Sequence, residues 1–410
     1  MLLIIKLAFR NVFRNFRRSL LTFLSITIIL GLAIIAIGFT RGFETGSLRT
    51  AVNTRTGHVK ILNRDYDTKD RLINLDHTIS DPENLISQIQ NVSGVRAYSE
   101  KILFPCSLTD GVDELVLIGF GVNLEREDRV FKISQYIVKG NYLSSGEEKM
   151  LLGDDLARLF DVDVGDFITI ITRTKYNSIN ALDVEIAGIY HFNNPELDNN
   201  AFFMPLDVTQ EFLDMQNEVT ELTIFGSSMD VADDLAEEIM SNIDTDLYQT
   251  QTWEEVLEEL LKFFKLRAKS RIIIYTILLM MAAAGIMNTM LMAVYERTRE
   301  IGTLMAMGFR KKKMIVLFAM ESVYIGLFGS VTGCVWGGIV AYYFKNNGLD
   351  MRSFGFEINN LPISMVVYGD IDFYVILSVF FTGILLALVS ALYPAYRSSK
   401  LVPTEALRAV

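Results

Sequence analysis

The residues that say most about what this chain can bind lie in segment 296–314, between two long apolar runs. Four of them recur at the spacing of one helical face: Ile301, Leu304, Met305 and Gly308. Six bases surround this stripe: Arg297, Arg299, Arg310, Lys311, Lys312 and Lys313. A connecting loop needs no apolar face. The pattern therefore predicts a short helix that docks against a partner.

Residues that could perform catalysis are scattered. The histidines, His58, His77 and His191, have no nucleophile or paired carboxylates at a readable spacing, and we expect each of them at the surface. Cys106 and Cys334 have no metal-binding spacing, and we do not expect them to pair. The sequence also lacks the G-x-x-x-x-G-K-[ST] loop that holds nucleotide phosphates. We expect a non-catalytic chain that binds no metal and no nucleic acid, so energy for any transport has to come from another polypeptide.

Four apolar runs are each long enough to cross about 30 Å of hydrocarbon. We place them at 20–40, 272–295, 314–343 and 373–393. The third run contains Glu321, and the other three contain no charged residue. An ionisable group inside a span is a functional candidate. Glu321 lies near the inner end of its span, however, so it could equally extend toward the bases of segment 296–313.

The distribution of bases gives the orientation of the chain. Segments 1–19, 296–313 and 394–410 carry net charges of +5, +4 and +2, although the whole chain carries −11. These basic segments are expected to be cytoplasmic, and segments 41–271 and 344–372 to be external. The predicted fold class is an α-helical membrane protein with four transmembrane helices and both termini cytoplasmic. A large α+β domain is inserted between helices 1 and 2.

Segment 1–19 combines bases with apolar residues at helical spacing, among them Phe9, Phe13 and Phe16. This pattern favours an amphipathic helix at the inner membrane surface over a plain topogenic anchor. The apolar run that follows is too long for a cleaved secretory signal.

The external segment 41–271 has strand-like and helix-like runs that predict a folded α/β domain, in two subdomains. Its end predicts an unbroken amphipathic helix from Trp253 into the second span, because neither Gly nor Pro lies between Trp253 and Ile272. Such a helix could transmit motion, or it could simply connect the two parts.

The third span carries Gly329, Gly333 and Gly337 in a G-x-x-x-G-x-x-x-G register. Glycines at this spacing make a flat surface on which another helix can pack closely. We favour packing within one subunit over packing between subunits.

Three sequences and the glycine-rich third span together carry a family resemblance. Segment 296–322 reads E-R-T-R-E-I-G-T-L-M-A-M-G-F-R-K-K-K-M-I-V-L-F-A-M-E-S, segment 392–408 reads L-Y-P-A-Y-R-S-S-K-L-V-P-T-E-A-L-R, and segment 10–19 reads R-N-V-F-R-N-F-R-R-S. They resemble the FtsX-like permease domain, the membrane subunit of mechanotransmission ABC transporters, and the external domain resembles the MacB-like periplasmic domain. The resemblance implies a multi-pass protein of the bacterial inner membrane.

In that family, the segment after the second span is a coupling helix that seats in the ATPase subunit. The resemblance assigns this contact to eight residues: Glu296, Arg297, Glu300, Ile301, Gly302, Leu304, Met307 and Gly308. It implies two ATPase copies, which bind ATP and Mg, and a second permease that is identical or related. No cofactor is expected in this chain.

The sequences R-G-F-E-T-G-S at 41–47 and T-G-H-V-K-I-L-N-R-D-Y at 56–66 are similar to the lipoprotein-releasing (LolC/LolE) branch. Members of that branch extract lipoproteins from the membrane lipid and pass them to a periplasmic carrier. An acyl-chain cavity would then be lined by Phe39, Phe43, Met287 and Met290. Two alternatives remain: a MacB-type exporter of small molecules or peptides, and a signalling permease that controls a periplasmic hydrolase.

Overall fold

The computed structural model describes residues 2–14, 16–66, 75–192, 194–350 and 366–402. The chain divides into two compact units. The membrane unit comprises Met1–Thr45, Phe263–Leu349 and Val367–Val410, and the external unit comprises Gly46–Lys262 and Asp350–Val366. The predicted insertion of a domain between the first and second spans is confirmed.

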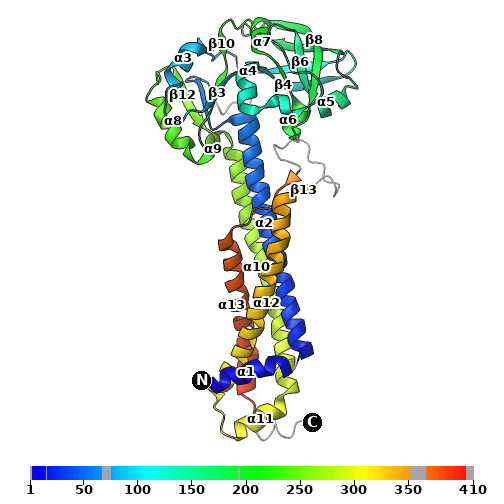
Figure 1. Ribbon diagram of the computed structural model, residues 1–410, viewed down its shortest axis with the longest axis vertical. Coiled ribbons are helices and arrows are strands. Elements are labelled where there is room, and N and C mark those ends of the chain that lie inside the picture. The colour runs from blue at the N-terminus through cyan, green and yellow to red at the C-terminus, as the bar shows by residue number, and fades with distance from the viewer. Residues whose placement is uncertain (1, 15, 67–74, 193, 351–365, 403–410) are drawn as a thin grey trace. The chain divides into compact units, whose positions relative to one another are not determined.

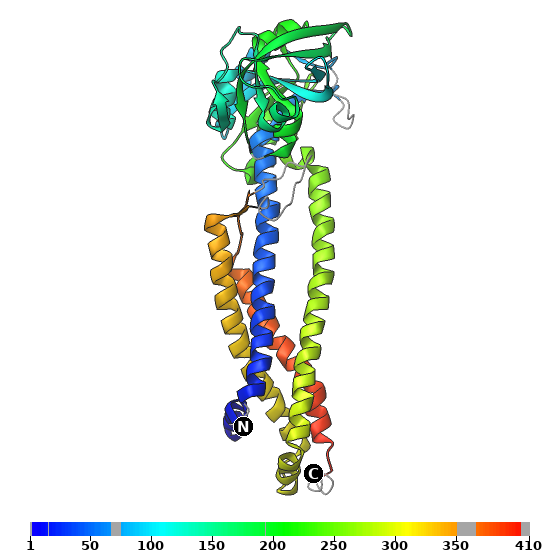
Figure 2. The same cartoon turned by 90° about the vertical axis from the view of Figure 1, so that its right-hand side faces the viewer.

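The membrane unit is built from helices (Figure 1, Figure 2). They are α1 (Leu2–Arg14), α2 (Phe16–Ala51), α10 (Glu258–Glu296), α11 (Thr298–Ala306), α12 (Lys311–Asn347) and α13 (Phe373–Ser399). Among the described residues, four helices are long and apolar enough to cross a membrane, as the sequence predicts: Ser19–Thr56, Glu258–Glu296, Lys311–Asn347 and Phe373–Ser399. They extend beyond the predicted spans, because the flanking polar residues continue the same helices.

The glycine register of α12 packs against α2 of the same chain. A Cβ added at Gly329 would lie 2.9 Å from Cγ2 of Ile26, and one at Gly333 would lie 2.9 Å from the carbonyl oxygen of Thr27. At Gly337 an added Cβ would lie 2.8 Å from Cα of Gly31. These distances are too short for any larger residue, so the three glycines allow the two backbones to approach closely.

The external unit contains a ten-stranded sheet, ordered β12-β1-β11-β3-β4-β9-β6-β8-β5, in which β7 pairs with both β3 and β8. Its strands are β1 (Val59–Asn63), β3 (Ala97–Thr109), β4 (Glu114–Val122), β5 (Ile137–Gly140), β6 (Lys149–Gly153), β7 (Phe167–Arg173), β8 (Ile179–Tyr190), β9 (Ala201–Pro205), β11 (Glu221–Phe225) and β12 (Tyr248–Thr252). The pairing therefore closes β3, β4, β9, β6, β8 and β7 into a ring. The strands β12, β1 and β11 extend the sheet from β3 of this barrel. The division of the external segment into two subdomains stays a prediction.

Helices pack around this sheet (Figure 1). They are α3 (Pro82–Ile89), α4 (Leu124–Phe131), α5 (Asp154–Leu159), α6 (Pro195–Asn200), α7 (Leu206–Phe212), α8 (Ala232–Met240) and α9 (Trp253–Val256). A π-helical turn, Val52–Thr56, follows α2. Two short two-stranded sheets pair β2 (Ile79–Ser80) with β10 (Glu218–Val219), and β13 (Leu349–Asp350) with β14 (Val366–Val367).

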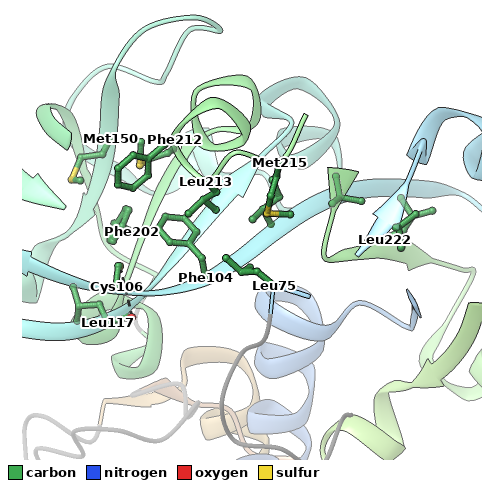
Figure 3. Close-up of a cluster of buried hydrophobic side chains, with 14 of the residues drawn as sticks. Leu75, Phe104, Cys106, Leu117, Met150, Phe202, Phe212, Leu213, Met215 and Leu222 are labelled. Atoms are coloured by element: carbon green, nitrogen blue, oxygen red, sulfur yellow. Dashed lines mark hydrogen bonds between the residues drawn. The ribbon is translucent and has the colours of Figure 1, made fainter. Parts of the chain in front are cut away.

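Each face of the barrel strands contributes to a different core. Phe202 belongs to one apolar cluster and the next residue, Phe203, to another, and Met150 and Leu151 divide in the same way. Successive side chains of a strand point to opposite faces, so the clusters lie on the two sides of the sheet. Figure 3 shows the larger cluster, in which the thiol of Cys106 contacts the carbonyl oxygen of Leu117 at 3.8 Å. Alternating apolar residues thus fix the strand register.

The predicted unbroken helix from Trp253 is wrong, because α9 and α10 are separated at Leu257. This residue has φ −96° and ψ 21° and is buried against Ala51 and Val52. Sequence pattern alone does not reveal the break, because Leu257 fits a helix by propensity and leaves it to bury its side chain.

The expectation that every histidine lies at the surface is wrong for His58. Its side chain is buried, and its Nδ1 accepts a hydrogen bond of 2.9 Å from the backbone N–H of Gly226. Burial lowers the pKa of His58. Cys106 and Cys334 are both free and buried.

Candidate functional site

The segment between α10 and α12 is anchored by Arg297, which lies between α10 and α11. Its Nη1 donates to both carboxylate oxygens of Glu321 at 3.3 Å, and its Nη2 donates to the carbonyl oxygen of Asn11 at 3.2 Å. Both charged side chains are buried. One guanidinium therefore joins α1, the start of α11 and the cytoplasmic third of α12. Its fork of fixed N–H donors makes arginine suited to this bridging geometry.

The apolar stripe packs partly against the chain itself, and its contact with a partner stays a prediction. Ile301 is buried, and Leu304 and Met305 are half-buried against a cluster that includes Met314 and Phe318 of α12. Gly302 and Arg297 are also buried. The helical periodicity identifies an apolar face correctly, but periodicity does not specify which surface covers that face.

Four residues of the segment are exposed: Glu296 at the end of α10, Glu300 on α11, and Met307 and Gly308 beyond the end of α11. Met307 is 72% exposed, although it is apolar. Gly308 has φ +90°, and no atom would lie within 4 Å of a Cβ added to it. Glu300 forms an ion pair with Arg14 of α1. Of the eight residues assigned to a partner contact, these four are accessible, Leu304 is partly so, and the other three pack inside the membrane unit.

Four exposed bases begin α12: Arg310, Lys311, Lys312 and Lys313. A helix N-terminus carries partial positive charge, so bases at this position do not stabilise the helix. They fit the positive-inside rule instead, which places such bases on the cytoplasmic side.

The membrane unit also contains an apolar cavity of about 630 Å³. Residues of α2, α10, α12 and α13 line it, among them Phe39, Leu278 and Val379. The lining side chains are hydrocarbon except for the hydroxyl groups of Tyr275, Ser378 and Thr382. A cavity of this size and composition can hold an apolar chain.

Of the four residues predicted to line a cavity, Phe39 lines this one. Phe43 instead packs against Phe264 at a ring-centroid distance of 6.4 Å, and Met290 is buried in the core of the helix bundle. Met287 is half-buried and does not line the cavity. A transmembrane helix is apolar all round, so its sequence does not show which face borders a cavity.

Polar contacts between α2 and α10 lie on either side of the cavity along the two helices. Arg271 donates to Glu44 at 3.0 Å, and the hydroxyl of Thr22 donates to that of Thr289 at 3.1 Å. The sequence analysis did not find these pairs. Their partners are separated by more than 200 residues, and no local signal links them.

The external unit buries several charges. Lys101 Nζ lies 2.9 Å from Glu127 Oε1, and each side chain is 1% exposed. Burial raises the pKa of Glu127, although the neighbouring Lys101 opposes this shift. Burial also raises the pKa of Asp198 to about 6, against hydrogen bonds from the backbone N–H groups of Phe192 and Asn194. Among the described residues, no group of three or more His, Cys, Asp or Glu residues could hold a metal ion.

Comparisons with known proteins match both parts of the chain. Residues 272–403 match the FtsX-like permease C-terminal family, and residues 19–242 match the MacB-like periplasmic core domain. The lipoprotein-releasing system transmembrane protein LolC of Xylella fastidiosa is 24% identical over 299 residues, 70% of this chain and 72% of that protein. An uncharacterized ABC transporter permease of Methanocaldococcus jannaschii, MJ1507, is 25% identical over 418 residues, 99% of this chain and 97% of that protein. The crystal structure of the periplasmic region of MacB from Actinobacillus actinomycetemcomitans covers 51% of this chain and 95% of that structure, at 10% identity and a TM-score of 0.36.

Proposed function

Because this chain belongs to the FtsX-like permeases of ABC transporters, with a MacB-like periplasmic core domain, we propose that it extracts lipoproteins from the membrane for a periplasmic carrier. It is a non-catalytic, multi-pass membrane protein, and as an ABC permease it works with an ATPase partner. The substrate assignment rests on similarity to lipoprotein-releasing proteins and on the cavity of the membrane unit.

The observation that carries the proposal is the apolar cavity between the spans. Burial of an acyl chain is worth about 0.8 kcal/mol per CH₂ group, so a chain leaves lipid without a large cost only for another apolar environment. A cavity of about 630 Å³ with an almost entirely apolar lining provides that environment. Release to an aqueous carrier then requires an energy source, which the ATPase supplies.

A second, smaller hollow of about 300 Å³ adjoins the first and shares Ser378 and Val379 with it. Its lining includes Arg41, Asp372 and Tyr374. A polar mouth beside an apolar cavity suits a ligand with an apolar tail and a polar head. The amino-terminal cysteine of a lipoprotein, with its attached acyl chains, has this form.

On the cytoplasmic side, we propose that two ATPase copies dock on the exposed face of the coupling segment of two permeases. Met307 and Gly308 would enter the ATPase, while Glu296 and Glu300 would offer charges to it. The buried residues of the segment would hold it in position against the membrane unit rather than touch the partner: Arg297, Ile301 and Gly302.

The cavity is tested by filling it. Ala33 lines the cavity, so Ala33→Trp in the reconstituted complex should abolish transfer of a triacylated lipoprotein to a soluble carrier while ATP hydrolysis persists. Ala284→Trp, at an exposed position of α10, is the matched control and should release normally. Normal release by Ala33→Trp would contradict the proposal.

The identity of the substrate is tested by what co-purifies with the complex. Bound triacylated lipoprotein would support release. An outer-membrane channel without lipoprotein would favour a MacB-type exporter, and a periplasmic hydrolase would favour a signalling permease.

The docking face is tested by Met307→Asp, which places a charge on an exposed position without disturbing the bundle. This variant should lose the ATPase during purification, whereas Met307→Leu should retain it. Retention by both variants would contradict the proposed contact.

A further inference from the structure

The first helix of the membrane unit, α1, divides its surface into three ladders, each with a repeat of four residues. One ladder is buried against the bundle: Ile4, Ala8 and Val12. The second is apolar but exposed, by 37%, 43% and 56% respectively: Ile5, Phe9 and Phe13. The third is basic and exposed: Lys6, Arg10 and Arg14. Residues four apart share one face of a helix, so these are three distinct faces.

Contacts along α1 fix how this helix lies in the membrane unit. The ring of Phe9 packs edge-on against Tyr324 of α12 at 5.5 Å, and the carbonyl oxygen of Asn11 accepts from Arg297. Figure 1 shows α1 lying across the other helices near their cytoplasmic end, with α11 beyond it. A helix that crosses the bundle at this level, with a basic face and an apolar face, has the composition of an interfacial helix.

We propose that α1 binds anionic phospholipids of the inner leaflet. Lys6 and Arg10 would pair with headgroup phosphates, and Phe9 and Phe13 would lie between the first methylenes of the acyl chains. Two observations support this partner. The exposed bases of α1 have no acid beside them on this helix, and Arg14 alone of the three pairs with an acid of another helix, Glu300. An exposed aromatic ladder beside them would be costly in water.

The same helix is connected to the coupling segment, which gives lipid binding a consequence. Arg14 of the basic ladder pairs with Glu300 of α11, and Arg297 joins Asn11 to Glu321. A headgroup phosphate at the basic ladder competes with Glu300 for Arg14. Lipid bound at α1 therefore changes how firmly α11 is held, and the ATPase docking face with it.

The lipid site does not depend on the identity of the cargo, so it can fail or hold independently of lipoprotein release. Its direct test is lipid retention by the purified complex of permease and ATPase in mixed nanodiscs of phosphatidylcholine and phosphatidylglycerol. After extraction, native mass spectrometry counts the lipids that remain bound. Lys6→Gln and Arg10→Gln should each lower retained phosphatidylglycerol about five-fold, with phosphatidylcholine unchanged.

Two control variants separate specific binding from a loss of net charge. Arg129→Gln/Lys132→Gln removes two exposed bases from the external unit and should retain phosphatidylglycerol normally. Lys6→Arg/Arg10→Lys keeps both charges and should also retain it. Equal retention by wild type and Lys6→Gln/Arg10→Gln would overturn the proposal, as would an equal loss in the external-unit control.

A second measurement follows α1 without altering its bases. A nitroxide attached at Phe13→Cys should lie deeper in vesicles that contain phosphatidylglycerol than in pure phosphatidylcholine. The buried Cys106 and Cys334 are replaced by Ser or Ala in this variant. A depth that does not change with phosphatidylglycerol would overturn the proposal.

Discussion

Two of the buried ion pairs, one taken from each unit, join different kinds of segments. In the external unit, Lys101 and Glu127 meet at 2.9 Å, and both side chains are 1% exposed. In the membrane unit, Arg297 and Glu321 meet at 3.3 Å, with side chains 7% and 2% exposed. Removing charges from water is costly, so the free energy of burying each pair has to be offset by the contacts that the pair makes.

The pairs differ in the number of segments that they join. Lys101 lies on β3 and Glu127 on α4, and the ammonium of Lys101 also lies 3.7 Å from the ring centroid of Phe131, again on α4. This pair fixes one helix on one strand. Arg297 instead joins α12 and α1 to the start of α11. The first pair therefore acts on the stability of its unit, and the second on the placement of a functional segment.

The largest expected effect comes from breaking the external pair. Lys101→Met leaves Glu127 buried without its counter-charge and should lower the free energy of unfolding by about 3–5 kcal/mol. Trp253 belongs to the external unit and its indole donates to the carbonyl oxygen of Met229. Urea unfolding followed by Trp253 fluorescence, with Trp336 replaced by Phe, measures the change.

The control for this prediction is Lys101→Met/Glu127→Leu, which removes both charges. It should be more stable than Lys101→Met, because an apolar pair of similar volume leaves no buried charge. If the double variant is as unstable as the single one, packing rather than charge explains the loss.

Breaking the membrane pair should change both the stability of the membrane unit and the coupling of ATP hydrolysis to lipoprotein release. Glu321→Gln removes a hydrogen-bonded charge from Arg297 and should cost about 1.5–3 kcal/mol, less than the external pair because Arg297 keeps its bond to Asn11. The number of ATP molecules hydrolysed per lipoprotein released should rise. Ser322→Ala, at the buried neighbouring position, is the control and should leave this ratio unchanged. An unchanged ratio in Glu321→Gln would remove Arg297 from its positioning role.

Much of the architecture could be predicted from the sequence, because apolar length and base distribution are local signals. The spans and the insertion of the external domain follow from them, and so does the close approach at Gly329, Gly333 and Gly337.

The details of the candidate site could not be predicted, because they depend on contacts between distant segments. The stripe of Ile301 and Leu304 predicts an apolar face, but only the positions of α1 and α12 show which part of this face the chain itself covers. The charge of Arg297 suggests a residue that docks on a partner. Its side chain is buried instead, because it pairs with Glu321, 24 residues away. The same reason explains why Phe39 lines the cavity while Met290 does not.

A third prediction compares glycines on one helix of the membrane unit. Gly333→Val would place a side chain against the backbone of Thr27 and should destabilise the α2–α12 contact by about 1–3 kcal/mol. Gly338→Val is the matched control, because a Cβ there meets no atom closer than Cδ1 of Ile376 at 3.8 Å. Thermal unfolding in detergent, followed by Trp336 fluorescence with Trp253 replaced by Phe, measures both variants. Equal destabilisation would mean that helix propensity, not packing, decides the effect.

The smallest predicted effect is a pH dependence confined to the external unit. Burial raises the pKa of Asp198 to about 6 from 3.8, so the folded state binds a proton at a higher pH than the unfolded state does. The free energy of unfolding should therefore rise as the pH falls from about 6 to about 4. His191 Nδ1 lies 3.4 Å from Asp198 Oδ2 and 3.8 Å from a carboxylate oxygen of Asp154. The neighbouring His191 lowers the pKa of Asp198, and burial outweighs this effect.

Asp198→Asn isolates this contribution, because it keeps the shape of the side chain and cannot titrate. The difference in unfolding free energy between wild type and this variant, measured by Trp253 fluorescence across the same pH range, should increase toward low pH. His191→Gln should enlarge the rise, because it removes a neighbour that lowers the pKa of Asp198. A difference that falls toward low pH would mean that the backbone hydrogen bonds from Phe192 and Asn194 outweigh burial. Asp198 lies in the external unit and Trp336 in the membrane unit. The free energy of unfolding measured by Trp336 fluorescence should therefore not depend on the titration of Asp198.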